Sequence, residues 1–82
     1  MNLVNEHDLL ALGYRLELWT VDGNDICVSY TNCEVKDGIM LKTVFGRGRT
    51  LQDACYDYHK QIKGKTLVFN SNKEGGCEVR VL

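Results

Sequence analysis

Proline is absent from this chain of 82 residues, so its turns must be made by Asp, Asn and Gly, which tolerate turn geometry. Long apolar runs are absent too, since no stretch approaches the roughly 18 residues that a membrane span needs. The first residues lack the basic start and apolar stretch of a secretory signal. We therefore expect a soluble intracellular protein without membrane contacts. A hydrophobic content of 44% predicts one globular domain, residues 1–82.

Closely spaced cysteine pairs are also missing. The four cysteines are Cys27, Cys33, Cys55 and Cys77, and none belongs to a C-x-x-C pair. Each lies in an apolar pattern, where a free thiol is usually buried. We therefore expect buried or half-buried thiols, with no metal and no cofactor. Two disulfides, or a zinc site that also uses His7 or His59, are the less favoured alternatives.

Signatures of enzymatic chemistry are missing as well. The chain has no H-E-x-x-H, no G-x-S-x-G, no suggestive pair of carboxylates and no cysteine beside a credible base. So short a chain has little room for a deep pocket, although a homodimer could form one between its subunits. The sequence predicts a protein that is not an enzyme and offers no catalytic residue.

One strongly marked helix is what the chain does contain. Thr50 is a favourable N-cap, Asp53 follows it at the spacing of a capping box, and Gly64 is placed to end the helix. The apolar residues between these signals recur at spacings of three and four, which predicts one buried stripe. The stripe consists of Leu51, Ala54, Cys55, Tyr58 and Ile62.

Alternating polar and apolar residues before this helix predict a meander of three strands, at residues 14–19, 26–35 and 39–45. The last strand should present Ile39, Leu41, Thr43 and Phe45 on one face. Within the second strand the apolar phase changes to Cys33 and Val35, which predicts a bulge at residues 31–33.

Two short strands should follow the helix, at residues 66–70 and 77–81, joined by a turn at 71–76. A short helix capped by Asn5 and ended by Gly13 should precede the meander. The predicted class is α+β, in which the main helix covers one face of a mostly antiparallel sheet.

The net charge of −1 hides an uneven distribution along the chain. Residues 1–41 contain two basic and seven acidic side chains, a net charge of −5. Residues 42–65 contain six basic and two acidic side chains, a net charge of +4. Separate fields of opposite sign could each steer a charged partner.

The acidic segment predicts a surface that binds a basic region of a partner protein, such as a nucleic-acid channel. A tryptophan on its polar side is a typical interface anchor. This candidate acidic face comprises Glu17, Trp19, Asp22, Asp25, Glu34 and Asp37. Tyr56 lies off the helical stripe and should also be partly exposed.

The basic segment predicts an anion site at a glycine-arginine turn. Its glycines would let the backbone approach a ligand, the helix N-terminus favours anions, and arginines grip phosphate. The candidate nucleic-acid or nucleotide site comprises Gly46, Arg47, Gly48, Arg49, Lys63 and Lys65. Alternatively, the glycines only shape the turn and the arginines only add solubility. A third alternative is an oligomeric sponge for a phosphorylated small molecule.

The pattern Gly46-Arg-Gly48-Arg-Thr50, continued through Asp53-Ala-Cys to Leu67-Val-Phe69, resembles a recurrent segment of small bacteriophage accessory proteins. It covers roughly residues 39–70. The resemblance implies a viral protein in the cytoplasm of an infected bacterium, in a class that often inhibits host defence, including anti-CRISPR proteins. It gives no residue a role.

The element order is similar to that of a double-stranded-RNA-binding domain or a HicB-type antitoxin domain. The main helix, however, opens with Thr50 to Asp53 where the RNA-binding domain has a lysine cluster. The hypothesis is therefore a non-enzymatic phage protein that inhibits a host defence factor by binding it.

Overall fold

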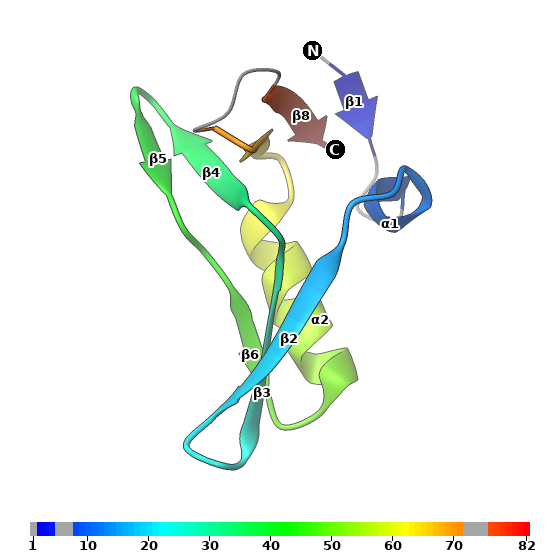
Figure 1. Ribbon diagram of the computed structural model, residues 1–82, viewed down its shortest axis with the longest axis vertical. Coiled ribbons are helices and arrows are strands. Elements are labelled where there is room, and N and C mark those ends of the chain that lie inside the picture. The colour runs from blue at the N-terminus through cyan, green and yellow to red at the C-terminus, as the bar shows by residue number, and fades with distance from the viewer. Residues whose placement is uncertain (1, 5–7, 72–75) are drawn as a thin grey trace.

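The computed structural model describes residues 2–4, 8–71 and 76–82. It contains two sheets, one in the order β1-β8-β7-β4-β5 and one in the order β2-β3-β6, together with helices α1 (Asp8–Ala11) and α2 (Leu51–Ile62) (Figure 1). The strands are β1 (Asn2–Val4), β2 (Leu16–Val21), β3 (Asp25–Tyr30), β4 (Cys33–Asp37), β5 (Met40–Lys42), β6 (Gly46–Gly48), β7 (Thr66–Phe69) and β8 (Cys77–Val81). Among these strands only β1 and β8 pair in parallel. The predicted α+β class is confirmed.

The predicted meander is present but is divided between the two sheets. β3 leads into β4, and β5 leads into β6, so the same two segments pair once in each sheet. Between these pairings, residues 29–34 lie opposite residues 43–45. The first segment thus has three residues more than the second between the two pairings, so it must bulge, and Asn32 takes a φ of 53° in this bulge. The predicted bulge is therefore the break between the sheets.

Several predicted boundaries are wrong. The expected strand at 39–45 is reduced to the three residues of β5, and the expected glycine-arginine turn is β6 itself, because Gly46, Arg47 and Gly48 pair with β3. β1 was not predicted, since three residues are too few for an alternating pattern. The predicted cap Asn5 and most of the turn at 71–76 lie outside the described residues.

Helix α2 begins and ends where the sequence predicts. Thr50 is extended, and its Oγ1 accepts a hydrogen bond from the Asp53 N–H at 3.1 Å. Gly64 takes a φ of 75°, as a residue that ends a helix commonly does. The expected burial of Leu51 is wrong, since it is 46% exposed. β6 reaches only the level of Asp53 and Ala54, so the first turn of α2 projects past it.

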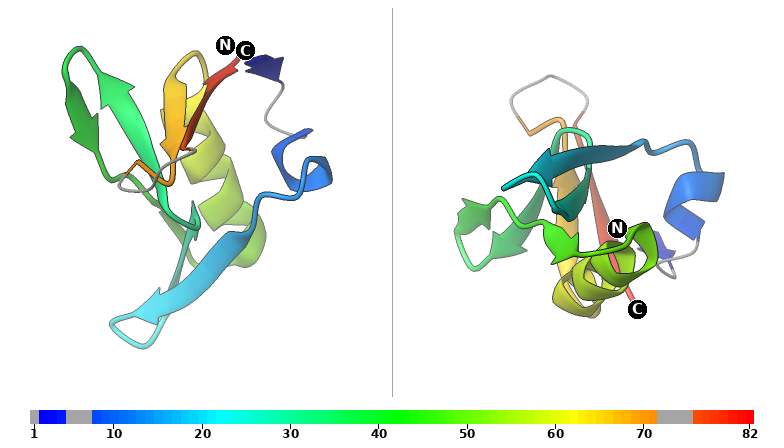
Figure 2. Two further views of the ribbon diagram at one scale, coloured as in Figure 1. Left: turned by 45° about the horizontal axis from the view of Figure 1, so that its top comes forward. Right: turned by 90° about the horizontal axis from the view of Figure 1, so that it is seen from below.

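The core lies where α2 crosses the junction of the two sheets, so the helix covers two sheets and not the single one expected (Figure 2). Its centre is Tyr58, whose Oη accepts a hydrogen bond from the buried Tyr30 N–H at 3.1 Å. The buried cluster is Leu9, Val28, Tyr30, Cys33, Val35, Ala54, Tyr58, Ile62, Leu67, Phe69, Val79 and Val81. Neither described helix has the length and apolar character that crossing a membrane requires.

The four cysteines are free thiols in different environments. Cys27 and Cys33 are buried and Cys55 is half-buried, but the expected burial of Cys77 is wrong, because it lies exposed at the start of β8. Burial raises the pKa of the Cys33 thiol to about 12. The Tyr14 hydroxyl lies 3.3 Å from Cys77 Sγ, and this contact raises the pKa of Tyr14 to about 12.

The rate of thiol labelling should follow the exposure of the cysteines. At pH 9 we expect an alkylating reagent to modify Cys77 first and Cys33 only after unfolding, with urea-unfolded protein as the control and mass spectrometry as the readout. Burial raises the pKa of Cys33 from its ordinary value of 9.0 to about 12. The free energy of unfolding therefore contains the full contribution of the buried neutral thiol below pH 9, and this contribution is lost as the pH rises toward about 12. Equal labelling rates for Cys33 and Cys77 would contradict the described burial.

Candidate binding surface

The three-stranded sheet has one face against α2 and one face without a covering element among the described residues. Gly46 and Gly48 of β6 point at the helix, so Arg47 points away from it. Trp19, Cys27 and Arg47 are neighbours across the three strands and share this outer face. By the same alternation it also carries Glu17, Ser29 and Phe45.

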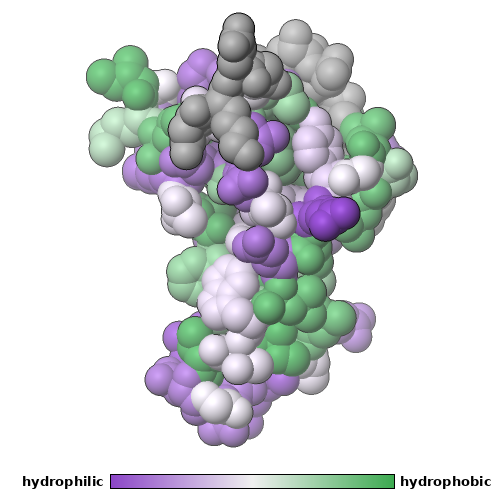
Figure 3. Space-filling model, viewed as in Figure 1, coloured by the Kyte–Doolittle hydropathy of each residue, from purple (hydrophilic) through white to green (hydrophobic). Residues whose placement is uncertain are grey.

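An aromatic pair dominates this outer face. The ring centroids of Trp19 and Phe45 are 5.9 Å apart, and the two side chains are 38% and 44% exposed. Cys27 lies on the same face with no exposure, so its neighbours cover it. Leu18, at the margin of the sheet, is 53% exposed. In the view of Figure 3, hydrophobic residues lie on both sides of a paler patch in the lower half of the molecule, above a largely hydrophilic lower end.

Phe45 lies on the outer face, whereas the sequence predicted a different arrangement for it. The row of Ile39, Leu41 and Phe45 was expected to form one apolar strand face, but these three side chains are exposed. On β6 the residues of the alternate row, Gly46 and Gly48, face the helix instead. Glycine carries no hydrophobic signal, so the alternating pattern could not show which row is buried.

The two glycines allow β6 to pack closely on α2. A Cβ at Gly46 would lie 2.5 Å from Tyr58 Cβ and would also overlap the Ala54 carbonyl oxygen. A Cβ at Gly48 would lie 2.6 Å from Asp53 Cβ. Gly46 and Gly48 are not among the described glycines that have a positive φ. The interpretation of Gly46 and Gly48 as turn residues is therefore wrong, and the close approach of a ligand to them stays a prediction.

Arg47 joins the two charged segments that the sequence analysis expected to be separate. Its Nε donates to Asp25 Oδ2 at 2.7 Å, and its guanidinium also donates to Asp22 Oδ2 at 3.1 Å. Hydrogen bonds to these carboxylates raise the pKa of Arg47. The backbone N–H of Arg47 donates to Asp57 Oδ2 at 3.0 Å. This arginine is thus already engaged by acidic groups.

The remaining residues of the predicted anion site are not gathered together. Arg49 lies in a shallow depression with Asp22 and Asp25. Lys63 and Lys65 follow the last residue of α2, whereas Arg49 precedes its first, so about 18 Å of helix separates them. The fold does not bring the six predicted residues into one basic site.

The acidic segment is likewise mixed with positive charge. Asp37 forms an ion pair with Lys42 at 2.8 Å, which lowers the pKa of Asp37, and Lys36 pairs with Glu78 at 2.9 Å. The expectation of two separate fields is therefore wrong at these points. Of the predicted acidic face, Glu17 and Glu34 lie together beside a pocket.

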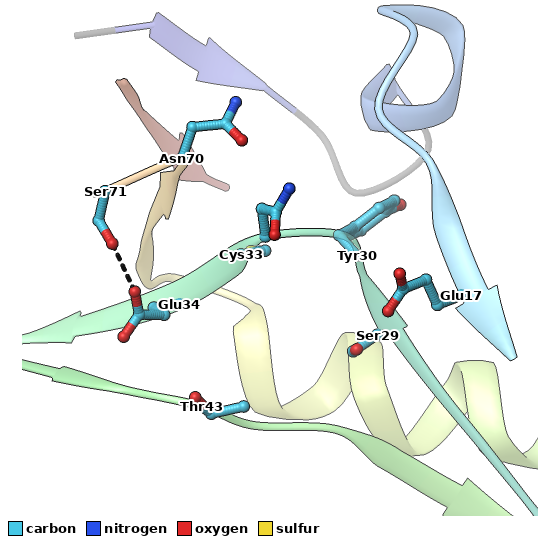
Figure 4. A pocket seen from close by; sticks show the side chains of 9 residues that line it. Glu17, Ser29, Tyr30, Cys33, Glu34, Thr43, Asn70 and Ser71 are labelled. Carbon is cyan, nitrogen blue, oxygen red and sulfur yellow. Dashed lines mark hydrogen bonds between the residues drawn. The ribbon is translucent and has the colours of Figure 1, made fainter. Parts of the chain in front are cut away.

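This pocket, of about 290 Å³, lies at the break between the two sheets (Figure 4). Its charged lining residues are Glu17 from β2 and Glu34 from β4, and the others are mostly hydroxyl and amide side chains. Ser71 Oγ donates to Glu34 Oε1 at 2.6 Å. The lining residues are Glu17, Ser29, Tyr30, Asn32, Cys33, Glu34, Thr43, Asn70 and Ser71.

Two asparagines shape the rim of the pocket. Asn32 and Asn70 have φ values of 53° and 55°, in the left-handed region that asparagine tolerates better than most residues. The Asn70 N–H donates to the Asn32 carbonyl at 2.8 Å and ties the two turns together. Neither asparagine was predicted to form part of a site, although asparagine next to a predicted bulge is a signal for such a turn.

The pocket and the aromatic pair are continuous. Glu17 and Ser29 face each other across β2 and β3, one step along the same face from Trp19 and Cys27. We call this surface the recognition face and define it as Glu17, Trp19, Phe45 and the pocket lining. It offers two exposed rings for apolar contact and two carboxylates for a positive charge.

Three side chains of the predicted acidic face, Glu17, Trp19 and Glu34, belong to the recognition face. Asp22 and Asp25 lie beyond it at the tip of the β2–β3 hairpin, and Asp37 lies at the end of β4. The described residues contain no cluster of His, Cys, Asp and Glu suited to hold a metal ion.

Known protein families, curated proteins and solved structures contain no match to this chain.

Proposed function

We propose that this protein is a non-enzymatic interaction protein that binds a partner protein through the recognition face. The observation that carries the proposal is the exposed pair of Trp19 and Phe45 on a sheet face that α2 leaves open. Large aromatic side chains at the centre of a surface patch are the usual energetic anchors of protein interfaces. The carboxylates of Glu17 and Glu34 favour a partner with positive charge at the adjoining position.

The geometry favours a protein partner over a nucleic acid. Phosphate binding needs basic side chains that converge and are free to pair. Arg47 is engaged by Asp22 and Asp25, and the two lysines after α2 are at the far end of the helix from Arg49. The pocket beside the aromatic pair carries negative charge, which repels a phosphate backbone.

The resemblance to bacteriophage accessory proteins gives the proposal its specific form. In this form the protein acts in the cytoplasm of an infected bacterium and inhibits a host defence factor by covering a basic surface of it. A nucleic-acid channel of such a factor has the charge that Glu17 and Glu34 complement.

Trp19→Ala tests the proposal against a matched aromatic control. Tagged protein is incubated with bacterial lysate, and captured proteins are identified and then purified for affinity measurement. We expect Trp19→Ala to weaken capture of the specific partner at least ~10-fold, the loss typical of a central aromatic anchor. Tyr56→Ala removes an exposed aromatic from α2, outside the recognition face, and should leave capture unchanged.

The capture is repeated after nuclease treatment of the lysate. A partner that survives nuclease and is lost with Trp19→Ala supports the proposal. Capture that disappears with nuclease, or that falls on changing Arg47 and Arg49 to Ala but not with Trp19→Ala, would instead establish a nucleic-acid or phosphate binder. Circular dichroism of each variant shows whether it is folded.

A further inference from the structure

The strand beside the recognition face has a free edge. β2 is the end strand of its sheet, and no described strand pairs with its outer side. It contains six residues, whereas the other strands at sheet ends, β1, β5 and β6, contain three each. Figure 2 shows β2 along the margin of the molecule. β2 is thus the longest edge that the described sheets present.

The hydrogen-bonding groups of this edge can be assigned from the register. The Thr31 N–H donates to the Arg15 carbonyl, which continues the β2–β3 register by one pair. Hydrogen-bonded and non-hydrogen-bonded pairs alternate along an antiparallel ladder. The backbone N–H and C=O groups of Leu16, Leu18 and Thr20 therefore face away from β3. They form a row of donors and acceptors at the spacing that an added strand requires.

Among the described residues, β2 has few of the features that usually protect an edge, since Glu17 is its only charged side chain. Natural proteins block such strands with lysine, proline, bulges or covering elements. The sequence of β2, Leu-Glu-Leu-Trp-Thr-Val, has no lysine or proline, and its register with β3 is unbroken. Its four central residues, 17–20, are exposed, and Leu18 and Trp19 offer apolar contact on both faces.

The side chains beside the edge specify the chemistry of an added strand. Residues directly opposite each other on neighbouring strands share a face and approach to about 5 Å between Cβ atoms. A basic side chain opposite Glu17 would pair with its carboxylate and lie at the mouth of the pocket that Glu34 also lines. An apolar side chain two residues away would lie opposite Trp19.

We propose that the partner of the recognition face presents an extended basic segment, which adds to β2 as a further strand. The segment carries a basic and an apolar residue two positions apart, placed opposite Glu17 and Trp19. This inference rests on the proposed function, because it specifies how the recognition face binds its protein partner. Backbone hydrogen bonds to Leu16, Leu18 and Thr20 would set the register of the added segment on β2. The carboxylates that line the pocket would favour a segment with positive charge.

Selection from a yeast-displayed library of random twelve-residue peptides tests the proposal with defined probes. On the unmodified protein we expect enrichment of peptides with an Arg or Lys two positions from an apolar residue. The same selection on Glu17→Gln combined with Glu34→Gln should lose the basic preference and keep the apolar one. A synthetic peptide from the selection should bind at least ~10-fold more weakly when its arginine is replaced by citrulline, a neutral side chain of similar shape.

Leu18→Pro and Leu18→Ala form a matched pair that tests strand addition itself. Both remove the leucine side chain, but only proline removes the outward N–H, and an edge position tolerates proline because no internal ladder bond is lost. We expect the synthetic peptide to bind Leu18→Ala at least ~10-fold more tightly than Leu18→Pro. On the unmodified protein, amide exchange at Leu16, Leu18 and Thr20 should slow on peptide binding, a readout independent of either variant.

The outcomes separate the inference from the proposed function. Peptides that show no basic preference, equal binding by the two Leu18 variants, or unchanged amide exchange would overturn strand addition. Dimers of the protein that dissociate on Leu18→Pro would also overturn it, because a second copy would then occupy the edge. In all these cases partner capture lost with Trp19→Ala would still support the proposed function, whereas its retention would overturn that function as well.

Discussion

Gly46→Ala is expected to unfold the protein or to destabilise it by more than about 3 kcal/mol, the upper part of the range for overpacking a core. The added Cβ would meet the Ala54 carbonyl oxygen and, at 2.5 Å, Tyr58 Cβ. The first of these atoms belongs to the helix backbone, so no side-chain rotation can relieve the overlap. β6 would have to move away from α2, and the core around Tyr58 would open.

Gly64→Ala is the control for this substitution. Gly64 has a φ of 75°, but a Cβ there would meet nothing within 4 Å. The expected loss is only about 1–2 kcal/mol, the cost of placing alanine in the left-handed region. Urea unfolding followed by circular dichroism measures both variants. Equal stability of the two variants would contradict the close contact of β6 with α2.

Tyr58→Ala is expected to lower the free energy of unfolding by about 3–5 kcal/mol, the range found when a buried aromatic is truncated. Tyr58 is 1% exposed at the centre of the core, and its ring centroid lies 5.7 Å from that of Tyr30. For a domain of this size such a loss is a large fraction of the total stability. Urea unfolding followed by circular dichroism should show a correspondingly lower midpoint for this variant.

Tyr58→Phe separates the ring from the hydroxyl. The Tyr30 N–H donates to Tyr58 Oη at 3.1 Å in a buried position, so removing the acceptor should cost about 1–3 kcal/mol. Tyr56→Ala, at a residue 67% exposed, is the surface control and should change stability by less than about 0.5 kcal/mol. If Tyr58→Phe were as stable as the unmodified protein, the hydrogen bond would contribute nothing.

The substitutions at Gly46 and at Tyr58 both change the contact between β6 and α2, on which the recognition face depends. Gly46 and Tyr58 hold β6 against α2, and this contact turns the opposite row, Phe45 and Arg47, outward. Trp19 then meets Phe45 across the sheet. The stability of the helix–strand contact and the exposure of the aromatic pair therefore have one structural cause.

Local signals in the sequence determined much of this protein. The caps at Thr50 and Gly64 fixed α2, because capping is an interaction between residues close in the chain. The change of apolar phase located the break at residues 31–33, since strand alternation is also local. The α+β class follows from the order of such elements.

Only the tertiary structure decided which row of β6 is buried and which charges meet. Glycine at 46 and 48 carries no hydrophobic signal, yet the close approach of α2 requires it. Arg47 meets Asp22 and Asp25 because β3 pairs with β6, a contact between residues more than 20 positions apart. Net charge along a sequence cannot show such pairings, because they depend on strand register. For the same reason, the pocket between Glu17 and Glu34 could not be read from their places in the chain.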